Sequence, residues 1–469
     1  MNASQILRLV HESGIEQVRI AWCDAHGDLR AKSILPRALA AALQGGIGMV
    51  GTLALKDTSD RTAFKVFEAD GLAHLSILNE FSQASNFMVK PVMESFRVLP
   101  WAPRTAWLQG QMLGADGRPL EVDTRGILQK ALAQLAHQGY GLRCGLEIEF
   151  HIYKIENTRT PIDPELAAWP GLPPAVSMIH PGYRLLSERY LDRCDEPLQI
   201  VRSTCEALGL PLTSLEVEFG PSQLEAVFDV QDALNAADSM VLFRSATTQA
   251  LQRAGYHATF MCRPPFPSIM SSGWHLHQSL VNLKTGDNAF AADTENGKSL
   301  SKTGQHWLAG LIAHANGICA LANPTIDAYE RFKPNALAPT RANWGTDSRS
   351  AMLRVIHAGE ATRIENRIGS PLANPYLYFA SQIYAGLDGM AQQQLPPEEN
   401  GAGNHANAAL LPTDLGLALD ALQSDAALAQ GFGEQVLAWF TQIKRQEITR
   451  YAAASDKPDW IRREYFSRY

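Results

Sequence analysis

Several stretches of the sequence alternate apolar residues with glutamate or histidine, and this alternation limits the folds that the chain can adopt. The first reads Gly-Leu-Glu-Ile-Glu-Phe-His-Ile over residues 145–152 and places Glu147 and Glu149 two positions apart. Side chains of a strand alternate between its two faces, so both carboxylates point to one face while the apolar residues bury the other. The chain therefore needs a sheet with one face against a core and one face that carries charge.

The same pattern recurs later in the chain. The stretches are Leu-Glu-Val-Glu-Phe over 215–219, Trp-His-Leu-His over 274–277 and Arg-Ile-Glu-Asn-Arg over 363–367. Each stretch taken alone is also typical of a strand with a solvated face, but glutamate is depleted in sheets. If the strands share one sheet, their carboxylates line one concavity and repel one another unless a cation is bound. Carboxylate oxygens suit Mg²⁺ and Mn²⁺, so the pattern predicts a divalent metal site.

Arginines supply the opposite charge in the last third of the chain. They are Arg331, Arg349, Arg354, Arg363 and Arg367, in segments rich in turn residues. Guanidinium groups bind carboxylates and phosphates through paired hydrogen bonds. A metal–carboxylate cavity with an arginine wall suits a nucleoside triphosphate and an anionic co-substrate, and it therefore favours phosphoryl transfer.

Composition excludes several classes of function. The 469 residues include 41 Lys+Arg and 48 Asp+Glu, a net charge of −7, whereas a nucleic-acid-binding protein needs a basic surface. The sequence shows no signal peptide and no stretch of about 18 uncharged apolar residues, so no membrane association is expected. Six scattered cysteines without a CxxC pair are typical of free thiols in a reducing compartment, which predicts a cytoplasmic protein.

The order of expected elements indicates two domains. A helical pattern over 5–14 precedes a strand hairpin over 18–34, and short strand-like runs continue to Trp107. We expect residues 1–105 to form a small α+β domain and residues 106–469 a larger one. The larger domain is expected to begin with a helix over 126–137 and a strand over 141–153.

These motifs, in this order, resemble the glutamine synthetase superfamily over nearly the full chain. Further matching segments are 258–261, 272–277, 323–325 and 373–376. The resemblance implies an α+β fold in which 1–105 is an N-terminal β-grasp domain. Residues 106–469 would be a catalytic domain with a curved antiparallel sheet and flanking helices. It also implies a homo-oligomer of stacked rings with active sites between subunits.

The resemblance implies a role for each charged residue. The ligands of one divalent cation would be Glu149, Glu218 and Glu225, and those of a second would be Glu147, His275 and Glu365. The contacts to ATP would be His277, Arg349, Arg354 and Arg363. Arg331 and Arg367 would bind glutamate, and Arg331 and Arg349 would act in catalysis. This complete set speaks against a non-catalytic structural relative.

Departures from the family concern the acceptor. Where ammonia-using members carry a glutamate in a flap segment, this chain has Leu337, and Asp57 is the acid nearest to their N-terminal ammonium motif. Met270 and Trp274 flank the substrate loop and add apolar surface. An apolar pocket disfavours an ammonium cation because of the cost of desolvation, whereas an arylamine is already neutral and needs no strong base.

The predicted reaction is therefore the ATP-dependent ligation of the γ-carboxylate of L-glutamate to a primary amine through γ-glutamyl phosphate. The product is a γ-glutamylamide, and the preferred acceptor is a hydrophobic or aromatic amine such as aniline. A polyamine or ethanolamine remains an alternative if Asp57 or another acid takes the amine proton. Ammonia, a structural role, and a glutamate-independent acid–amine ligase also remain open. The last rests on Met270-Ser271, which replaces the family's Asn-Gly.

Overall fold

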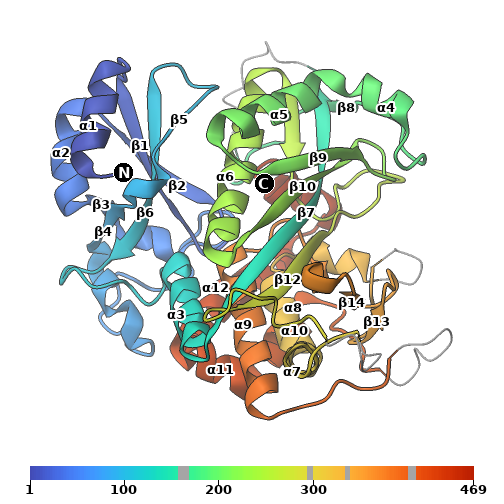
Figure 1. Cartoon of the computed structure of the whole chain (residues 1–469). Helices are drawn as coiled ribbons and strands as arrows, with labels where there is room; N and C mark the ends of the chain where they lie inside the picture. Colours follow the sequence, from blue (N-terminus) through green and yellow to red (C-terminus); the bar gives the residue numbers. More distant parts are fainter. Residues whose placement is uncertain (157–167, 293–298, 333–337, 400–407) are drawn as a thin grey trace.

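The structure is a computed structural model that describes residues 1–156, 168–292, 299–332, 338–399 and 408–469. Its strands form a six-stranded and a nine-stranded sheet. Figure 1 shows the smaller sheet with its helices on the left and the larger sheet on the right. Two sheets of unequal size with helices packed around them confirm the predicted α+β class.

The smaller sheet is built from the N-terminal part of the chain. Its strands are β1 (Gln17–Cys23), β2 (Leu29–Ile34), β3 (Ile47–Val50), β4 (Asn86–Pro91), β5 (Arg97–Val98) and β6 (Thr105–Leu113). The order is β2-β1-β6-β4-β3, with β5 also on β6, and only β1 and β6 run parallel. The boundary predicted at residue 105 falls on the first residue of β6, so a division after Leu113 keeps this sheet whole.

Two helices, α1 (Ala3–Glu12) and α2 (Pro36–Gly45), pack on the smaller sheet. The Asn2 side chain accepts the N–H of Gln5, whose side chain accepts the N–H of Asn2 in return, so α1 begins with a capping box. Ile6 and Val10 lie one turn apart and are buried against the sheet.

The larger sheet carries the alternating stretches. Its strands are β7 (Tyr140–Ile155), β8 (Val176–Met178), β9 (Leu212–Val217), β10 (Gln223–Asp232), β11 (Tyr256–Thr259), β12 (Trp274–Asn282), β13 (Trp344–Thr346), β14 (Leu353–Ile356) and β15 (Arg363–Gly369). The order is β13-β14-β15-β12-β7-β10-β9, and β8 and β11 also pair with β7. All pairs are antiparallel except β13 with β14. The long strand β7 is therefore the centre of the sheet.

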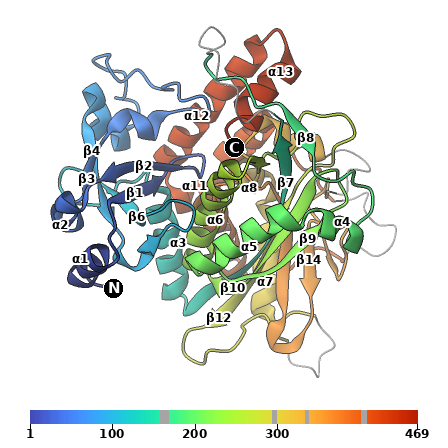
Figure 2. The same cartoon turned by 90° about the horizontal axis from the view of Figure 1, so that it is seen from above.

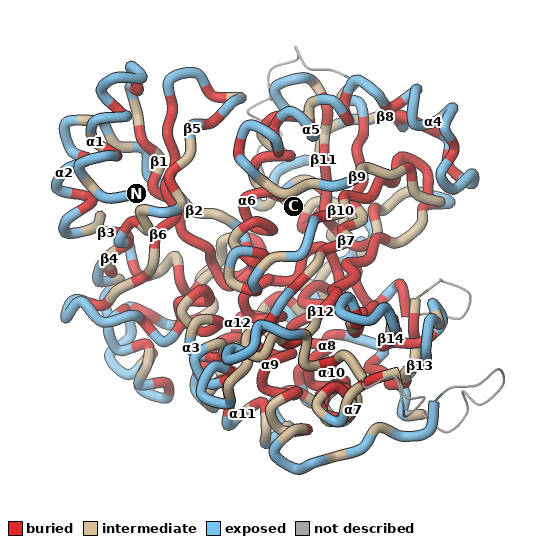
Figure 3. The backbone as a smooth tube through the Cα atoms, viewed as in Figure 1, coloured by how far each residue is buried: buried red, intermediate tan, exposed pale blue. Residues whose placement is uncertain are grey.

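Helices pack around the larger sheet. They are α3 (Thr124–His137), α4 (Glu188–Arg193), α5 (Asp195–Leu208), α6 (Ala233–Arg253), α7 (Lys302–Ala313), α8 (Ala315–Ala322), α9 (Pro375–Ala391), α10 (Leu415–Ser424), α11 (Ala426–Phe432), α12 (Glu434–Ala453) and α13 (Lys457–Ile461). Of these helices, α3 and α6 contact β7 directly. Figure 2 shows α6 and α12 between the two sheets. Phe150 of β7 stacks edge-on against Phe243 of α6, 5.9 Å between ring centres. Figure 3 shows buried residues along the length of β7.

Two contacts fix the helices to one another. At the junction of α7 and α8, the ring of His314 lies between Asp425 and Asp388, at 2.7 and 3.1 Å from their carboxylate oxygens. Gly310 of α7 packs so closely on α9 that a β-carbon there would lie 2.1 Å from the carbonyl oxygen of Ala385. Among the residues that the structure describes, no helix is long and apolar enough to cross a membrane.

Candidate active site

The alternating strands share one sheet and meet around β7, which meets the condition for their charged side chains to line one concavity. Glu149 of β7 lies opposite Glu225 of β10, and Glu147 lies opposite His275 of β12. His277, two residues further along β12, lies opposite Glu365 of β15. Since residues two apart in a strand share a face, the register places these side chains on one surface.

The side chains converge closely. Nδ1 of His275 lies 3.3 Å from a carboxylate oxygen of Glu147, and Nε2 lies 3.7 Å from Glu149. Nε2 of His277 lies 2.9 Å from the other oxygen of Glu147. Glu147 therefore touches both imidazoles of β12.

Two groups of possible metal ligands result. They are Glu147 with Glu225 and His275, and Glu147 with His277 and Glu365, each with ligand atoms within 4.8 Å of one another. The grouping differs from the predicted one, in which Glu225 belonged with Glu149 and Glu218, and His277 contacted only the nucleotide. Glu147 takes part in both groups because its strand is paired with β12 and β10 at once.

The electrostatics of the cluster call for a cation. Burial, then the neighbouring carboxylates, raise the pKa of Glu225 to about 10. Burial and the charge of Glu218 raise the pKa of Glu149 to about 7. Carboxylates packed this tightly cannot all keep their charge unless positive charge joins them. The oxygen and imidazole donors thus fit a divalent cation such as Mg²⁺ or Mn²⁺.

The carboxylates face arginines across a cavity of about 790 Å³. Its charged lining residues are Glu147, Glu149, Glu216, Glu218, Glu225, His275, Arg331, Arg349, Arg354 and Arg367. We refer to this space as the acidic cavity. The opposing charges make it suited to a substrate that carries both carboxylate and phosphate.

A second cavity, of about 580 Å³, adjoins the acidic cavity through Glu147. The predicted nucleotide contacts His277 and Arg363 line this second cavity, whereas Arg349 and Arg354 line the acidic one. Nε of Arg363 lies 3.2 Å from Nδ1 of His277. A guanidinium can only donate, so Nδ1 of His277 accepts this hydrogen bond.

Hydrogen bonds hold the arginine wall in place. Nη1 of Arg331 donates to the carbonyl oxygens of Ile368, at 2.9 Å, and Gly369, at 2.6 Å, at the end of β15. Glu365 is fully buried and pairs with both Arg367 and Arg354. Burial alone would raise the pKa of Glu365, but Arg367 and the two imidazoles hold it below its ordinary value. These bonds hold Arg331, Arg354 and Arg367 in place within the chain itself.

Trp274 is a correction to the predicted site. Its indole is fully buried and packs on Tyr378 and Phe379, with ring centres 5.4 and 5.7 Å away. It precedes His275 on β12 and so points to the opposite face of the strand. The prediction that Trp274 lines the amine pocket is therefore wrong.

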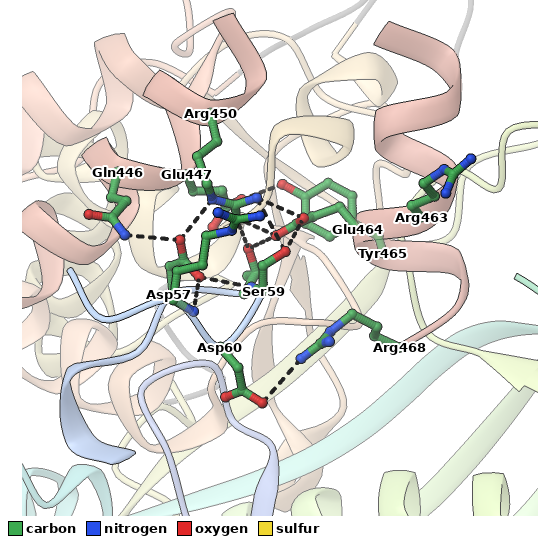
Figure 4. A network of polar contacts seen from close by, with 12 residues as sticks. Asp57, Ser59, Asp60, Gln446, Glu447, Arg450, Arg463, Glu464, Tyr465 and Arg468 are labelled. Atoms are coloured by element: carbon green, nitrogen blue, oxygen red, sulfur yellow. Dashed lines mark hydrogen bonds and ion pairs between the residues drawn. The ribbon is translucent and has the colours of Figure 1, made fainter. Parts of the chain in front are cut away.

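Asp57 lies in a network of polar contacts between the N-terminal part of the chain and α12 (Figure 4). Its buried carboxylate accepts the N–H groups of Ser59 and Arg61, at 2.9 Å each, and is held by Gln446 at 3.3 Å and Arg450 at 2.8 Å. It does not line the acidic cavity of its own chain. Four donors occupy the acceptor positions of this carboxylate within its own chain, and the catalytic role expected of Asp57, at a site between subunits, stays a prediction.

Met270 lines the acidic cavity, whereas Leu337 lies outside the described residues. Sequence reasoning missed other apolar residues of the cavity, among them Leu185, Leu186 and Phe219. The two leucines lie in the irregular segment between β8 and α4, where no periodic pattern could reveal them. Phe219 directly follows Glu218, and this adjacency was the available signal.

Comparison with known proteins finds relatives that match this chain from end to end. The family model "Glutamine synthetase, catalytic domain" matches residues 121–465. The gamma-glutamylanilide synthase of Acinetobacter sp. is 37% identical over 481 residues, which cover 99% of this chain and 95% of that protein. The gamma-glutamylethanolamide synthetase GlnA4 of Streptomyces coelicolor is 29% identical over 474 residues, 100% of this chain and 96% of that protein. A solved GmaS/ADP complex has a TM-score of 0.79 at 30% identity and covers 97% of this chain and 98% of that chain.

Proposed function

Since the chain belongs to the glutamine synthetase family and is an ATP-dependent acid–amine ligase, we propose that it joins the γ-carboxylate of L-glutamate to a primary amine. The carboxylate attacks the γ-phosphorus of ATP and forms γ-glutamyl phosphate and ADP. The amine then attacks the acyl carbon, phosphate leaves, and a γ-glutamylamide remains. The observation that carries the proposal is the acidic cavity, where a carboxylate–imidazole cluster faces an arginine wall.

The carboxylate cluster and His275 would hold the divalent cations, which we propose to be Mg²⁺ or Mn²⁺ as in the predicted site. Bound cations neutralise the phosphates and lower the cost of bringing two anions together. His277 and Arg363 are proposed to bind ATP in the second cavity, next to Glu147. This arrangement would direct the triphosphate from the second cavity towards the acidic one.

The arginine wall binds and orients the anions. Arg331 and Arg367 are proposed to hold the glutamate, because both line the acidic cavity and are fixed by β15. Arg349 and Arg354 line the same cavity and are proposed to neutralise the charge of the transferring phosphoryl group. Catalysis by such groups depends on positioning, and the hydrogen bonds of Arg331 and the ion pairs of Glu365 provide it.

We propose a hydrophobic or aromatic amine as the acceptor. A relative named for γ-glutamylanilide supports this choice, as do Met270 in the cavity and an uncharged leucine at position 337. An arylamine is neutral at working pH, so the absence of an acid at position 337 costs it nothing. A cationic amine would have to lose its hydration in an apolar pocket.

Assembly and location are also proposals. A homo-oligomer of stacked rings with active sites between subunits follows from the family. A cytoplasmic location is supported by the six cysteines, all of which are buried free thiols. Neither nucleic acid nor membrane is a proposed partner.

The test is phosphate release with ATP, Mg²⁺ or Mn²⁺ and glutamate, with ammonium, ethanolamine, putrescine, isopropylamine or aniline as acceptor. We expect aniline to be used best. Turnover with putrescine but not aniline would contradict the proposed acceptor, and no turnover with any amine would contradict the ligase. Glu225→Gln should abolish release, whereas Glu206→Gln, on the exposed surface of α5, should leave it unchanged. Leu337→Glu should raise the use of ammonium relative to aniline.

A further inference from the structure

We propose that Leu185 and Leu186, together with Phe219 and Met270, form the subsite for the apolar substituent of the acceptor amine and set the preference among amines. All four residues line the acidic cavity. This inference rests on the proposed function, because it assigns a wall of the same cavity. It concerns a segment that no sequence pattern marked.

The segment 183–186 is bound directly to the strand end that carries Glu218. The N–H of Tyr183 donates to the carbonyl oxygen of Phe219 at 2.6 Å, and the N–H of Leu186 donates to that of Val217 at 3.0 Å. These two bonds flank Glu218 on either side. The leucines therefore lie beside the carboxylate cluster, at its edge, and not on a remote surface.

The leucines are unusually exposed for residues that line a cavity. Leu185 is 52% and Leu186 61% exposed to solvent. Apolar surface left open beside a charged site gains free energy when a ligand covers it. Met270 is held next to Phe219, since it packs so tightly on the turn at Gly220 that a β-carbon there would lie 2.7 Å from its own.

Backbone strain marks the same place. Tyr183, Leu186 and Ser268 have φ angles of 59°, 53° and 54°, in the left-handed region that non-glycine residues rarely occupy. The Tyr183 hydroxyl donates to the carbonyl oxygen of Ser268 and ties the two strained segments together. The ring of Tyr183 also packs edge-on against Phe219, 5.5 Å between centres. Strain that the surrounding contacts hold in place is typical of a surface shaped for a ligand.

The chemistry of the reaction determines which part of the amine meets this surface. The amino group must reach the acyl carbon, next to the carboxylate cluster and the arginine wall. Its substituent then extends away from the arginine wall, past Glu218 and towards the two leucines. A phenyl ring buries apolar area there, whereas the hydroxyethyl group of ethanolamine buries little and loses water from its hydroxyl.

The test uses Leu185→Asn and Leu186→Asn in the full chain. Asparagine is close to leucine in size and tolerates the left-handed backbone at position 186, so the fold is preserved. Leu191→Asn is the matched control, because Leu191 is an exposed leucine of α4 that does not line the cavity. The measured quantity is kcat/KM for aniline and for ethanolamine, with the KM values for ATP and glutamate beside them.

Each cavity variant should lower the ratio of kcat/KM for aniline to that for ethanolamine about tenfold, the equivalent of about 1.4 kcal/mol of lost apolar contact. The KM values for ATP and glutamate should stay unchanged, and Leu191→Asn should behave as wild type. An unchanged ratio in an active enzyme would overturn the inference and leave the proposed function standing. Equal losses for both amines, together with a smaller oligomer in size-exclusion chromatography, would also overturn it, because the leucines would then cover a subunit contact. No phosphate release by the wild type with any amine would overturn both.

Discussion

Replacing Arg450 by methionine should destabilise the fold markedly, because this arginine is shared by two buried carboxylates. Its guanidinium lies 2.8 Å from Asp57 and 2.5 Å from Glu464, and both carboxylate side chains are 0% exposed (Figure 4). Methionine keeps much of the apolar stem and removes the charge. Both carboxylates would then stay buried without their cation.

The donors that remain on the two carboxylates determine how large the loss in the free energy of unfolding is. Removing one partner of a buried ion pair costs about 3–5 kcal/mol, since the other charge is left uncompensated. Other donors remain: Asp57 keeps two backbone N–H groups, and Glu464 keeps the hydroxyls of Thr58 and Ser59. We therefore expect a loss at the lower end of the range, about 3 kcal/mol in the free energy of unfolding.

The loss should depend on pH. Burial alone would raise the pKa of Glu464, but Arg450 holds it below its ordinary value. A carboxyl with a lowered folded-state pKa stabilises the protein above its unfolded-state pKa, and this contribution is lost as the pH falls through the folded-state value. The difference between wild type and Arg450→Met should thus be largest at neutral pH and should shrink in acid.

The assay is urea unfolding followed by tryptophan fluorescence at neutral pH and at about pH 5. At the lower pH the buried carboxyls of the variant begin to take up protons, because burial without Arg450 raises their pKa. Arg445→Met is the control, because Arg445 lies on the same helix α12 and pairs with Asp420 at the exposed surface. Such a pair contributes about 0–1 kcal/mol. The triple variant Asp57→Asn, Arg450→Met, Glu464→Gln should recover much of the loss. If Arg450→Met costs no more than Arg445→Met, the reasoning about buried charge is refuted.

Other predictions concern the helix junction, the helix packing and the metal site. Burial alone would lower the pKa of His314, but its two aspartates raise it above 6.5, so its contribution is full below the unfolded-state pKa and is lost as the pH rises through the folded-state value. The urea midpoint of His314→Gln should therefore fall less than that of wild type between pH values of about 6 and 8.5, and an equal fall would contradict this account. Gly310→Ala should cost about 1–3 kcal/mol because α9 leaves no room, whereas Gly45→Ala, with no atom within 4 Å, should be neutral in the same unfolding assay. Chelation of divalent cations should stop phosphate release, and adding Mn²⁺ should raise the wild-type urea midpoint but not that of Glu225→Gln; an equal rise in both would place the cation elsewhere.

Local alternation predicted which side chains share a face, because that property depends only on neighbouring residues in one strand. Glu147 with Glu149, and His275 with His277, follow from it directly. Alternation alone could not predict which strands lie side by side. The position of β7 between β10 and β12, which makes Glu147 common to both ligand groups, arises from pairing across long stretches of chain.

The same distinction explains what local patterns did not reveal. Trp274 directly precedes His275, so the alternation itself places its side chain on the buried face of β12. Asp57 pairs with Arg450, which also pairs with Glu464, almost at the other end of the chain. No local pattern indicates these contacts. Leu185 and Leu186 lie where the backbone follows no regular period, so only their fold could bring them to the cavity.

The pairing of β7 also has a consequence for how the chain folds correctly. If β7 paired with β10 and β12 one residue out of register, Glu147 and Glu149 would point into the apolar layer beside Phe243, and Ile148 would point into the cavity. Burying two unpaired carboxylates costs several kcal/mol, so misaligned sheets are rejected. The two glutamates thus disfavour wrong strand registers, in addition to any role that they have in ligand binding. Apolar residues at positions 147 and 149 would remove the repulsion in the cavity, but they would also remove the free-energy penalty on misaligned sheets.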